Sequence, residues 1–155
     1  ASDVYKRQRY SSPVSQLDLF ATTSAAAGAA LPADRAIDGV DLLPHVAGEA
    51  TGAPHRTLFW RSGGYRVVLH EGWKLHSLTH PAGDRLYHLA SDPTEQRDVA
   101  AQQPAKVAEL RAMLAAHDRL QAPPAWPSLV RAPIPIDRPL GQPPRRGENY
   151  IYWWN

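Results

Sequence analysis

The 155-residue sequence contains no cysteine. This absence excludes disulfides, cysteine-ligated metal sites and cysteine-derived nucleophiles within these residues. No apolar run approaches the roughly 20 residues of a membrane span, and no signal peptide is visible. The formal net charge of +2 is also too small to indicate nucleic acid or an acidic membrane as a partner.

Apolar residues and prolines are abundant, and they divide the chain into a globular part and a tail. Hydrophobic residues make up 43 % of the sequence, which is enough for the core of one domain. The fifteen prolines are concentrated toward the end. We therefore expect residues 121–155 to form an extended Pro-rich tail, whose aromatic end, 150–154, docks on a surface that the chain itself does not contain.

The first eight residues differ in character from the rest. The sequence begins without Met, and residues 3–8 equal the in-frame translation of a common transposon-adaptor sequence used for sequencing libraries. We expect residues 1–8 to be foreign and the gene to be truncated upstream of Arg9. The alternative is an ordinary basic N-terminal arm.

Residues 9–47 are predicted to be the end of a larger domain. The spacing predicts a helix over 15–27, capped by Ser15 with Asp18 in a capping-box-like position and stopped at Gly28. Its apolar face consists of Val14, Leu17, Phe20, Ala21 and Ser24. A turn at 38–41 then leads into a short apolar helical stretch whose face is too small to be stable alone.

After a Gly- and Pro-containing linker at 48–54, the apolar period changes to two. Strands are predicted at 57–61, 65–70, 73–77 and 85–89. Two tight turns, 62–64 and 71–72, and a loop at 80–84 connect them, which predicts an antiparallel meander.

A helix is predicted over 104–120, with Pro104 at its first position. Its apolar stripe consists of Val107, Leu110, Met113, Leu114, His117 and Leu120. Because a sheet must bury a face, we expect this helix to cover it. The fold class is therefore α+β: a four-stranded antiparallel sheet packed by one C-terminal helix over 48–120, preceded by the last helix of a truncated domain and followed by the tail.

The order of these segments resembles the C-terminal part of sulfatases. Residues 16–20 and 37–44 resemble the helix and the "aspartate-glycine-x-serine-leucine-leucine-proline" turn that close the family's α/β catalytic domain. Residues 65–68, 73–75 and 86–89, followed by 92–99, resemble the small C-terminal sheet and its "aspartate-proline-x-glutamate" segment. Four positions differ from the family's consensus sequence, although the spacing is kept: Ala21, Asp41, His88 and Asp98.

The resemblance implies a parent enzyme whose catalytic residues are elsewhere. Sulfatases hydrolyse sulfate esters with a formylglycine nucleophile, made from Cys or Ser in a Pro/Arg motif, and with a divalent cation, commonly calcium. The nearest serine version, residues 11–15, ends in Ser15 where the motif requires Arg. We therefore assign no catalytic residue, metal ligand or cofactor to this chain, and we expect the chain alone to be inactive. The family is often periplasmic or exported.

Four residues are candidates for a substrate rim: His55, Arg56, Arg61 and Lys74. Arginine binds sulfate oxygens in a bidentate manner. The alternative for the first three is a solvated strand end or an interdomain ion pair, and for Lys74 a strand position facing water. His76, His80, Asp84 and His88 are spaced by four, but such spacing gathers ligands only on a helix, so we favour exposed or edge histidines over a metal site.

Three interpretations of function follow. The preferred one is the C-terminal fragment of a sulfatase, whose partners are the missing catalytic domain and a sulfate ester. The parent is alternatively a related phosphodiesterase or phosphonate hydrolase. The third interpretation is a self-contained interaction module with an aromatic docking tail.

Overall fold

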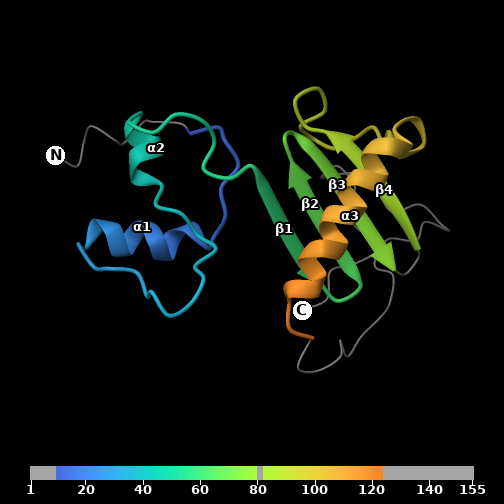
Figure 1. Ribbon diagram of the computed structural model, residues 1–155. Coiled ribbons are helices and arrows are strands. Elements are labelled where there is room, and N and C mark those ends of the chain that lie inside the picture. The colour runs from blue at the N-terminus through green and yellow to red at the C-terminus, as the bar shows by residue number, and fades with distance from the viewer. Residues whose placement is uncertain (1–9, 80–81, 124–155) are drawn as a thin grey trace, which may run out of the picture. The chain divides into compact units, whose positions relative to one another are not determined.

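The computed structural model describes residues 10–79 and 82–123 (Figure 1). The aromatic end and most of the predicted tail lie outside the described residues, as does His80. The chain divides into two compact units, residues 1–56 and 57–155. No helix in the described ranges is long and apolar enough to cross a membrane.

The first unit contains α1 (Asp18–Ala26) and α2 (Leu43–Ala47). The predicted helix at 15–27 is confirmed, but it begins three residues later. The capping residues nevertheless interact, because the Ser15 amide donates to Asp18 Oδ2 at 2.7 Å. Gly28 adopts φ +68° directly after α1, which is the left-handed conformation that ends helices.

Little of the predicted apolar face of α1 is buried. Ala21 is 1 % exposed, whereas Leu17 and Phe20 are more than half exposed. Gly39 lies against the start of α1, where a Cβ atom would be 2.1 Å from the carbonyl oxygen of Leu17. The Leu42 amide also donates to Thr22 Oγ1 at 3.0 Å. The first unit is therefore held by close backbone approach and hydrogen bonds more than by an apolar core.

The second unit is the predicted meander with its helix. Its four strands are β1 (Thr57–Ser62), β2 (Tyr65–His70), β3 (Trp73–Thr79) and β4 (Ala82–His88), in the order β1-β2-β3-β4. All neighbouring strands are antiparallel. A 3-10 turn, η1 (Ala100–Gln102), precedes α3 (Pro104–Leu120), which lies across one face of the sheet (Figure 1). The α+β fold class is confirmed.

The turns explain the register. Glu71 and Gly72 both have positive φ, 48° and 82°, which is the two-residue hairpin conformation that matches strand twist. The predicted loop at 80–84 is wrong in its second half, because β4 begins at Ala82. Gly83 and Asp84 pair with Leu78 and Ser77, so the sheet's hydrogen bonding extends through residues whose composition is typical of a loop.

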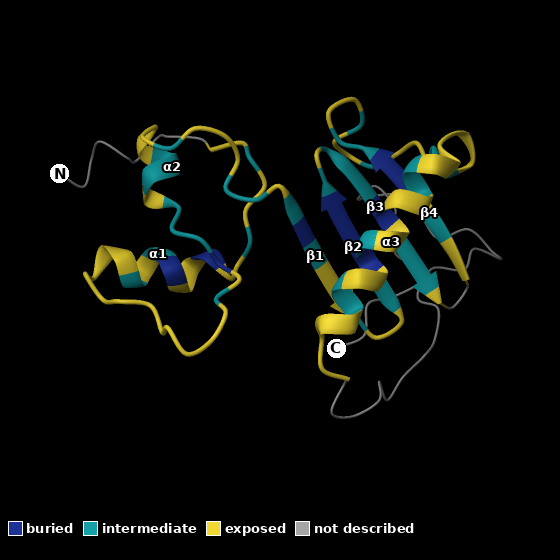
Figure 2. Cartoon of the chain, in the orientation of Figure 1, coloured by how far each residue is buried: buried dark blue, intermediate teal, exposed yellow. Residues whose placement is uncertain are grey.

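The core lies between the sheet and α3. Val68, Leu75 and Leu86 form one cross-strand row, and Leu110 and Leu114 of α3 pack on it. Leu120, predicted to continue the apolar stripe, is 84 % exposed, because it is the last residue of α3. Val67 and Leu69 point to the opposite face and are buried as well, so the middle of β2 is covered on both faces (Figure 2).

Candidate functional site

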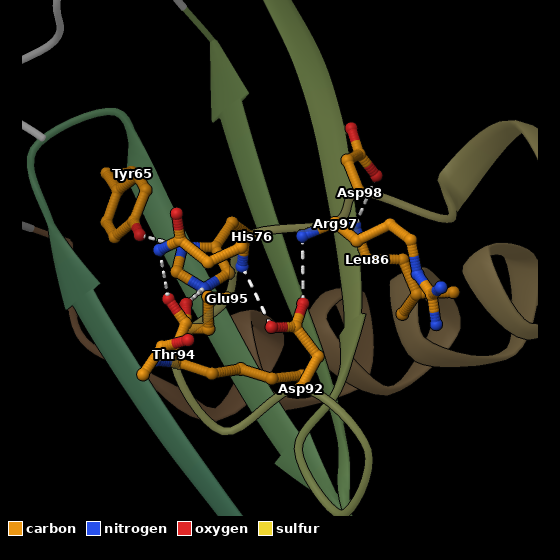
Figure 3. Close-up of polar contacts among 10 residues, drawn as sticks. Tyr65, His76, Leu86, Asp92, Thr94, Glu95, Arg97 and Asp98 are labelled. Atoms are coloured by element: carbon orange, nitrogen blue, oxygen red, sulfur yellow. Dashed lines mark hydrogen bonds and ion pairs between the residues drawn. The ribbon is translucent and has the colours of Figure 1, made fainter.

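The face of the sheet opposite α3 carries a cluster of polar side chains (Figure 3). Tyr65 stands at the start of β2, and Lys74 and His76 lie two residues apart on β3, so all three share this face. Glu95, from the loop after β4, reaches two of them: its Oε1 is 2.5 Å from Lys74 Nζ and its Oε2 is 2.8 Å from His76 Nε2. Tyr65 and His76 are hydrogen-bonded through the phenol oxygen and Nδ1. We call these four residues the Glu95 cluster.

Contacts within the Glu95 cluster indicate the form of the imidazole. Nε2 of His76 faces a carboxylate, so it carries the proton, and Nδ1 accepts the proton of the Tyr65 hydroxyl. Nε2 lies 2.8 Å from Glu95 Oε2 without forming a hydrogen bond, so this contact is electrostatic. Burial and the positive charge of Lys74 lower the pKa of His76, and Glu95 opposes them only in part. His76 is therefore neutral at pH 7.

The loop that carries Glu95 is shaped by two aspartates. Asp92 accepts hydrogen bonds from the backbone amides of Gln96 and Arg97, at 3.0 and 2.9 Å, and these bonds lower the pKa of its carboxyl group. Asp98 Oδ1 accepts from the amides of Leu86 and Ala100, at 3.0 and 2.9 Å. Glu95 itself has φ +55°, a conformation that a non-glycine residue adopts at a cost. The loop's acidic residues therefore fix its shape and its attachment to β3 and β4.

A second polar centre lies inside the first unit. Asp18 is fully buried, and its carboxylate accepts from the amides of Ser15 and Val40 and contacts His55 Nε2 at 2.7 Å. Burial alone would raise the pKa of Asp18, but these hydrogen bonds outweigh it and hold the pKa below its usual value. Asp18 thus joins the start of α1, the segment at Val40 and the end of the unit at His55. This arrangement satisfies a buried charge and leaves no open position for a substrate.

The four predicted rim residues are not brought together by the contacts within either unit. His55 is largely buried as the partner of Asp18, and Arg56 is exposed. Arg61 donates to the Ala122 carbonyl at 2.9 Å and lies 3.9 Å from Asp118, on the α3 side of the sheet. Lys74 lies on the opposite face. It does not face water as the strand pattern suggested, because it is mostly buried and paired with Glu95.

The described residues of the four-spaced histidine and aspartate pattern lie on different faces of the sheet. His76 lies on the face of the Glu95 cluster, whereas Asp84 and His88 point to the α3 side. Asp84 pairs with Arg111, and His88 packs against Trp73 and contacts Ser91. The described residues contain no group of three His, Asp or Glu side chains that could hold a metal ion.

The sequence analysis did not predict the Glu95 cluster. Glu95 lies in a loop with a left-handed turn, and no repeating residue pattern predicts such a turn. The order of the motifs along the chain is the sequence feature that could have indicated this cluster. The Trp73–Leu75 motif supplies Lys74, the 92–99 motif supplies Glu95 and Asp98, and Asp98 binds the Leu86 amide of the 86–89 motif. The residues of the three motifs thus contact one another and build the subdomain.

The fold defines a small α+β subdomain, and comparisons with known proteins find similar segments within larger hydrolases. No protein-family model matches the chain. Steryl-sulfatase of Rattus norvegicus is 37 % identical over 70 residues, which is 45 % of this chain and 12 % of the relative. Steryl-sulfatase of Mus musculus is 43 % identical over 67 residues, 40 % of this chain and 11 % of the relative. The chain thus spans about an eighth of the length of these curated relatives.

Solved structures give the same result. A 2-O GAG sulfatase has a TM-score of 0.55 and 27 % identity, over 66 % of this chain and 24 % of that chain. Ps i-CgsB, at 23 % identity and a TM-score of 0.64, covers 77 % of this chain and 27 % of that chain and shows the fold alone. The phosphonate monoester hydrolase of Silicibacter pomeroyi, at 19 % identity and a TM-score of 0.55, shares the fold over 72 % of this chain and 26 % of that chain. The chain resembles the C-terminal region of the sulfatase family.

Proposed function

We propose that this chain is the C-terminal part of an enzyme that hydrolyses sulfate esters, and that its own role is structural. The observation that carries the proposal is the identity of 37–43 % to steryl-sulfatases over the matched segment, because those relatives are named for this chemistry. The formylglycine nucleophile and the divalent cation belong, in this proposal, to the part of the polypeptide upstream of Arg9.

The exposed face of α1 supports an upstream partner. Leu19 and Phe20 are more than half exposed on a helix of nine residues, and Val14 and Leu17, just before this helix, are 45 % and 58 % exposed. A helix this short gains most of its stability from burying an apolar face, so a free face of this size is typical of a segment cut from its packing partner. The proposed occupant is the rest of the catalytic domain.

Periplasmic or secreted location, and a place for His55, Arg56, Arg61 and Lys74 near a substrate, remain predictions of this proposal. Arg56 is the candidate chosen for a test, because it is exposed. Arg56→Ala in the complete enzyme is expected to raise KM for a sulfate ester with little change in kcat, if its guanidinium contacts substrate only in binding.

The deciding experiment is to recover and express the genomic reading frame that contains residues 9–155. The expected product hydrolyses an aryl sulfate, loses activity with a calcium chelator and carries Cys or Ser at the nucleophile position. The 155-residue chain, purified in parallel, is expected to show no turnover. Sulfatase turnover by this chain alone, free of contaminating enzyme, would refute the structural role.

The fold shared with the phosphonate monoester hydrolase favours one rival parent. A Thr nucleophile upstream, with faster hydrolysis of a phosphonate monoester than of an aryl sulfate, would assign the parent to that chemistry. The structural role of residues 9–123 would then stay as proposed, and only the reaction would change.

A further inference from the structure

The two edge strands of the sheet, β4 and β1, differ in whether their outward-facing backbone groups have hydrogen-bond partners. On β4, the Leu86 amide donates to Asp98 Oδ1 at 3.0 Å, and the Leu86 carbonyl accepts from the Val99 amide at 2.9 Å. The segment after β4 thus satisfies the outward-facing backbone groups in the middle of that edge. Such coverage is one way in which proteins prevent an edge strand from pairing with another chain.

The β1 edge lacks this protection within the described residues. Ser62 and Tyr65 flank the two-residue turn and form a hydrogen-bonded pair, so the backbone groups of Thr57, Phe59 and Arg61 point away from β2. No described residue forms a backbone hydrogen bond with these outward groups. The strand contains no Pro or Lys, and its six pairs with β2 run without a bulge. A straight edge of this kind is a template for strand addition.

The same edge strand carries an exposed aromatic side chain, Trp60. Trp60 is 41 % exposed, whereas its neighbours on β1 are packed: Leu58 is buried, and Phe59 stacks on His117 with the ring centroids 4.1 Å apart. An exposed indole next to unpaired backbone groups offers both parts of a strand interface, which are main-chain hydrogen bonds and apolar side-chain contact.

We propose that the β1 edge pairs with β1 of a second copy of this chain, antiparallel and with Trp60 opposite Trp60 of that copy. The inference does not rest on the proposed sulfatase parent. In this register Phe59 faces Arg61 of the other copy, so the outward backbone groups of both strands meet and no like charges stand opposite one another. The two tryptophans occupy a non-hydrogen-bonded pair, where side chains are closest. The interface is two-fold symmetric, which is the commonest form of homodimer.

Sedimentation of the purified chain over the micromolar range tests the proposal. A reversible monomer–dimer equilibrium is expected. Trp60→Lys places two lysines across the symmetry axis and is expected to weaken dimerisation by at least about tenfold. Leu120→Lys is the matched control, because Leu120 is 84 % exposed and belongs to α3 rather than to the edge strand. It is expected to leave the equilibrium unchanged.

A second variant tests the register. Since the chain has no cysteine, Trp60→Cys introduces a unique thiol, and oxidation is expected to give a disulfide-linked dimer readily. Leu120→Cys is expected to cross-link much more slowly. A chain that is monomeric at every concentration would overturn the proposal. So would equal weakening by Leu120→Lys, which indicates unspecific apolar association, or equal cross-linking by both cysteine variants.

Discussion

His76 is largely buried between a lysine and a glutamate, and this position determines how the second unit responds to acid. Burial and Lys74 lower its pKa below the ordinary value of about 6.5, which it regains on unfolding. The unfolded chain therefore binds a proton more readily than the folded one. The stability linked to His76 is fully present above pH 6.5 and is lost as the pH falls through the lowered folded-state pKa.

Urea unfolding, followed by tryptophan fluorescence at pH 7.5 and pH 5, measures this effect. We expect the free energy of unfolding to fall between these values, and His76→Gln to remove part of the fall. Asp18 and Asp92 do not interfere, because their pKa values are lowered. The stability linked to these two carboxylates is therefore lost only below about pH 4. Leu120→Ala, which removes no titratable group, should keep the full response. An undiminished fall in His76→Gln would show that another group causes it.

Gly39 tests the close approach that holds the first unit together. A Cβ atom there would lie 2.1 Å from the Leu17 carbonyl oxygen, a backbone atom that cannot rotate away. Gly39→Ala is therefore expected to destabilise the first unit by about 1–3 kcal/mol. Circular dichroism at 222 nm should show the loss of helix. Gly83→Ala is the control, because a Cβ atom at Gly83 meets nothing within 4 Å, and an equal effect of both variants would contradict the steric explanation.

At the scale of elements, α3 is the part that most needs the sheet. Leu110 is fully buried on Val68, Leu75 and Leu86, whereas Leu120 at the end of the same helix is exposed. The same substitution at both sites separates burial from helix propensity. Leu110→Ala is expected to cost about 2–5 kcal/mol in chemical denaturation and Leu120→Ala less than about 0.5 kcal/mol. Similar costs at the two sites would show that α3 is not anchored through Leu110.

Helices and strands could be predicted wherever apolar residues recur at a regular spacing along the chain. The alternation over 65–70 and the turn at Glu71 and Gly72 predicted β2 and its hairpin, because each is encoded within a few residues. The start of β4 and the exposure of Leu120 were predicted wrongly. Both depend on how far neighbouring elements extend, and this information is tertiary rather than local.

The polar centres could be predicted only in part. Ser15 and Asp18 were recognised as a capping pair because they are three residues apart, but His55, which completes the buried centre, is 37 residues from Asp18. Glu95 reaches Lys74 through a left-handed residue in a loop, and no spacing rule predicts that. The family resemblance located the correct motifs, and the structure showed that they contact one another.

At the scale of the whole molecule, the two units differ in how their stability arises. The second unit has a closed apolar core between sheet and helix, so it is expected to fold by itself. Ala21 is the buried apolar residue of the described first unit, and the large apolar side chains of α1 are exposed. We therefore expect the first unit to be less stable than the second when the chain is studied by itself.

Hydrogen exchange measured by mass spectrometry distinguishes a fragment from a self-contained module. We expect amides of β2 and β3 to be strongly protected, because they lie in the interior of the sheet. Amides of α1 should be only weakly protected, since a nine-residue helix that buries little apolar surface is marginal in water. Comparable protection of α1 and β2 would show that the first unit is stable alone. That result would favour the interaction module over a fragment of a hydrolase.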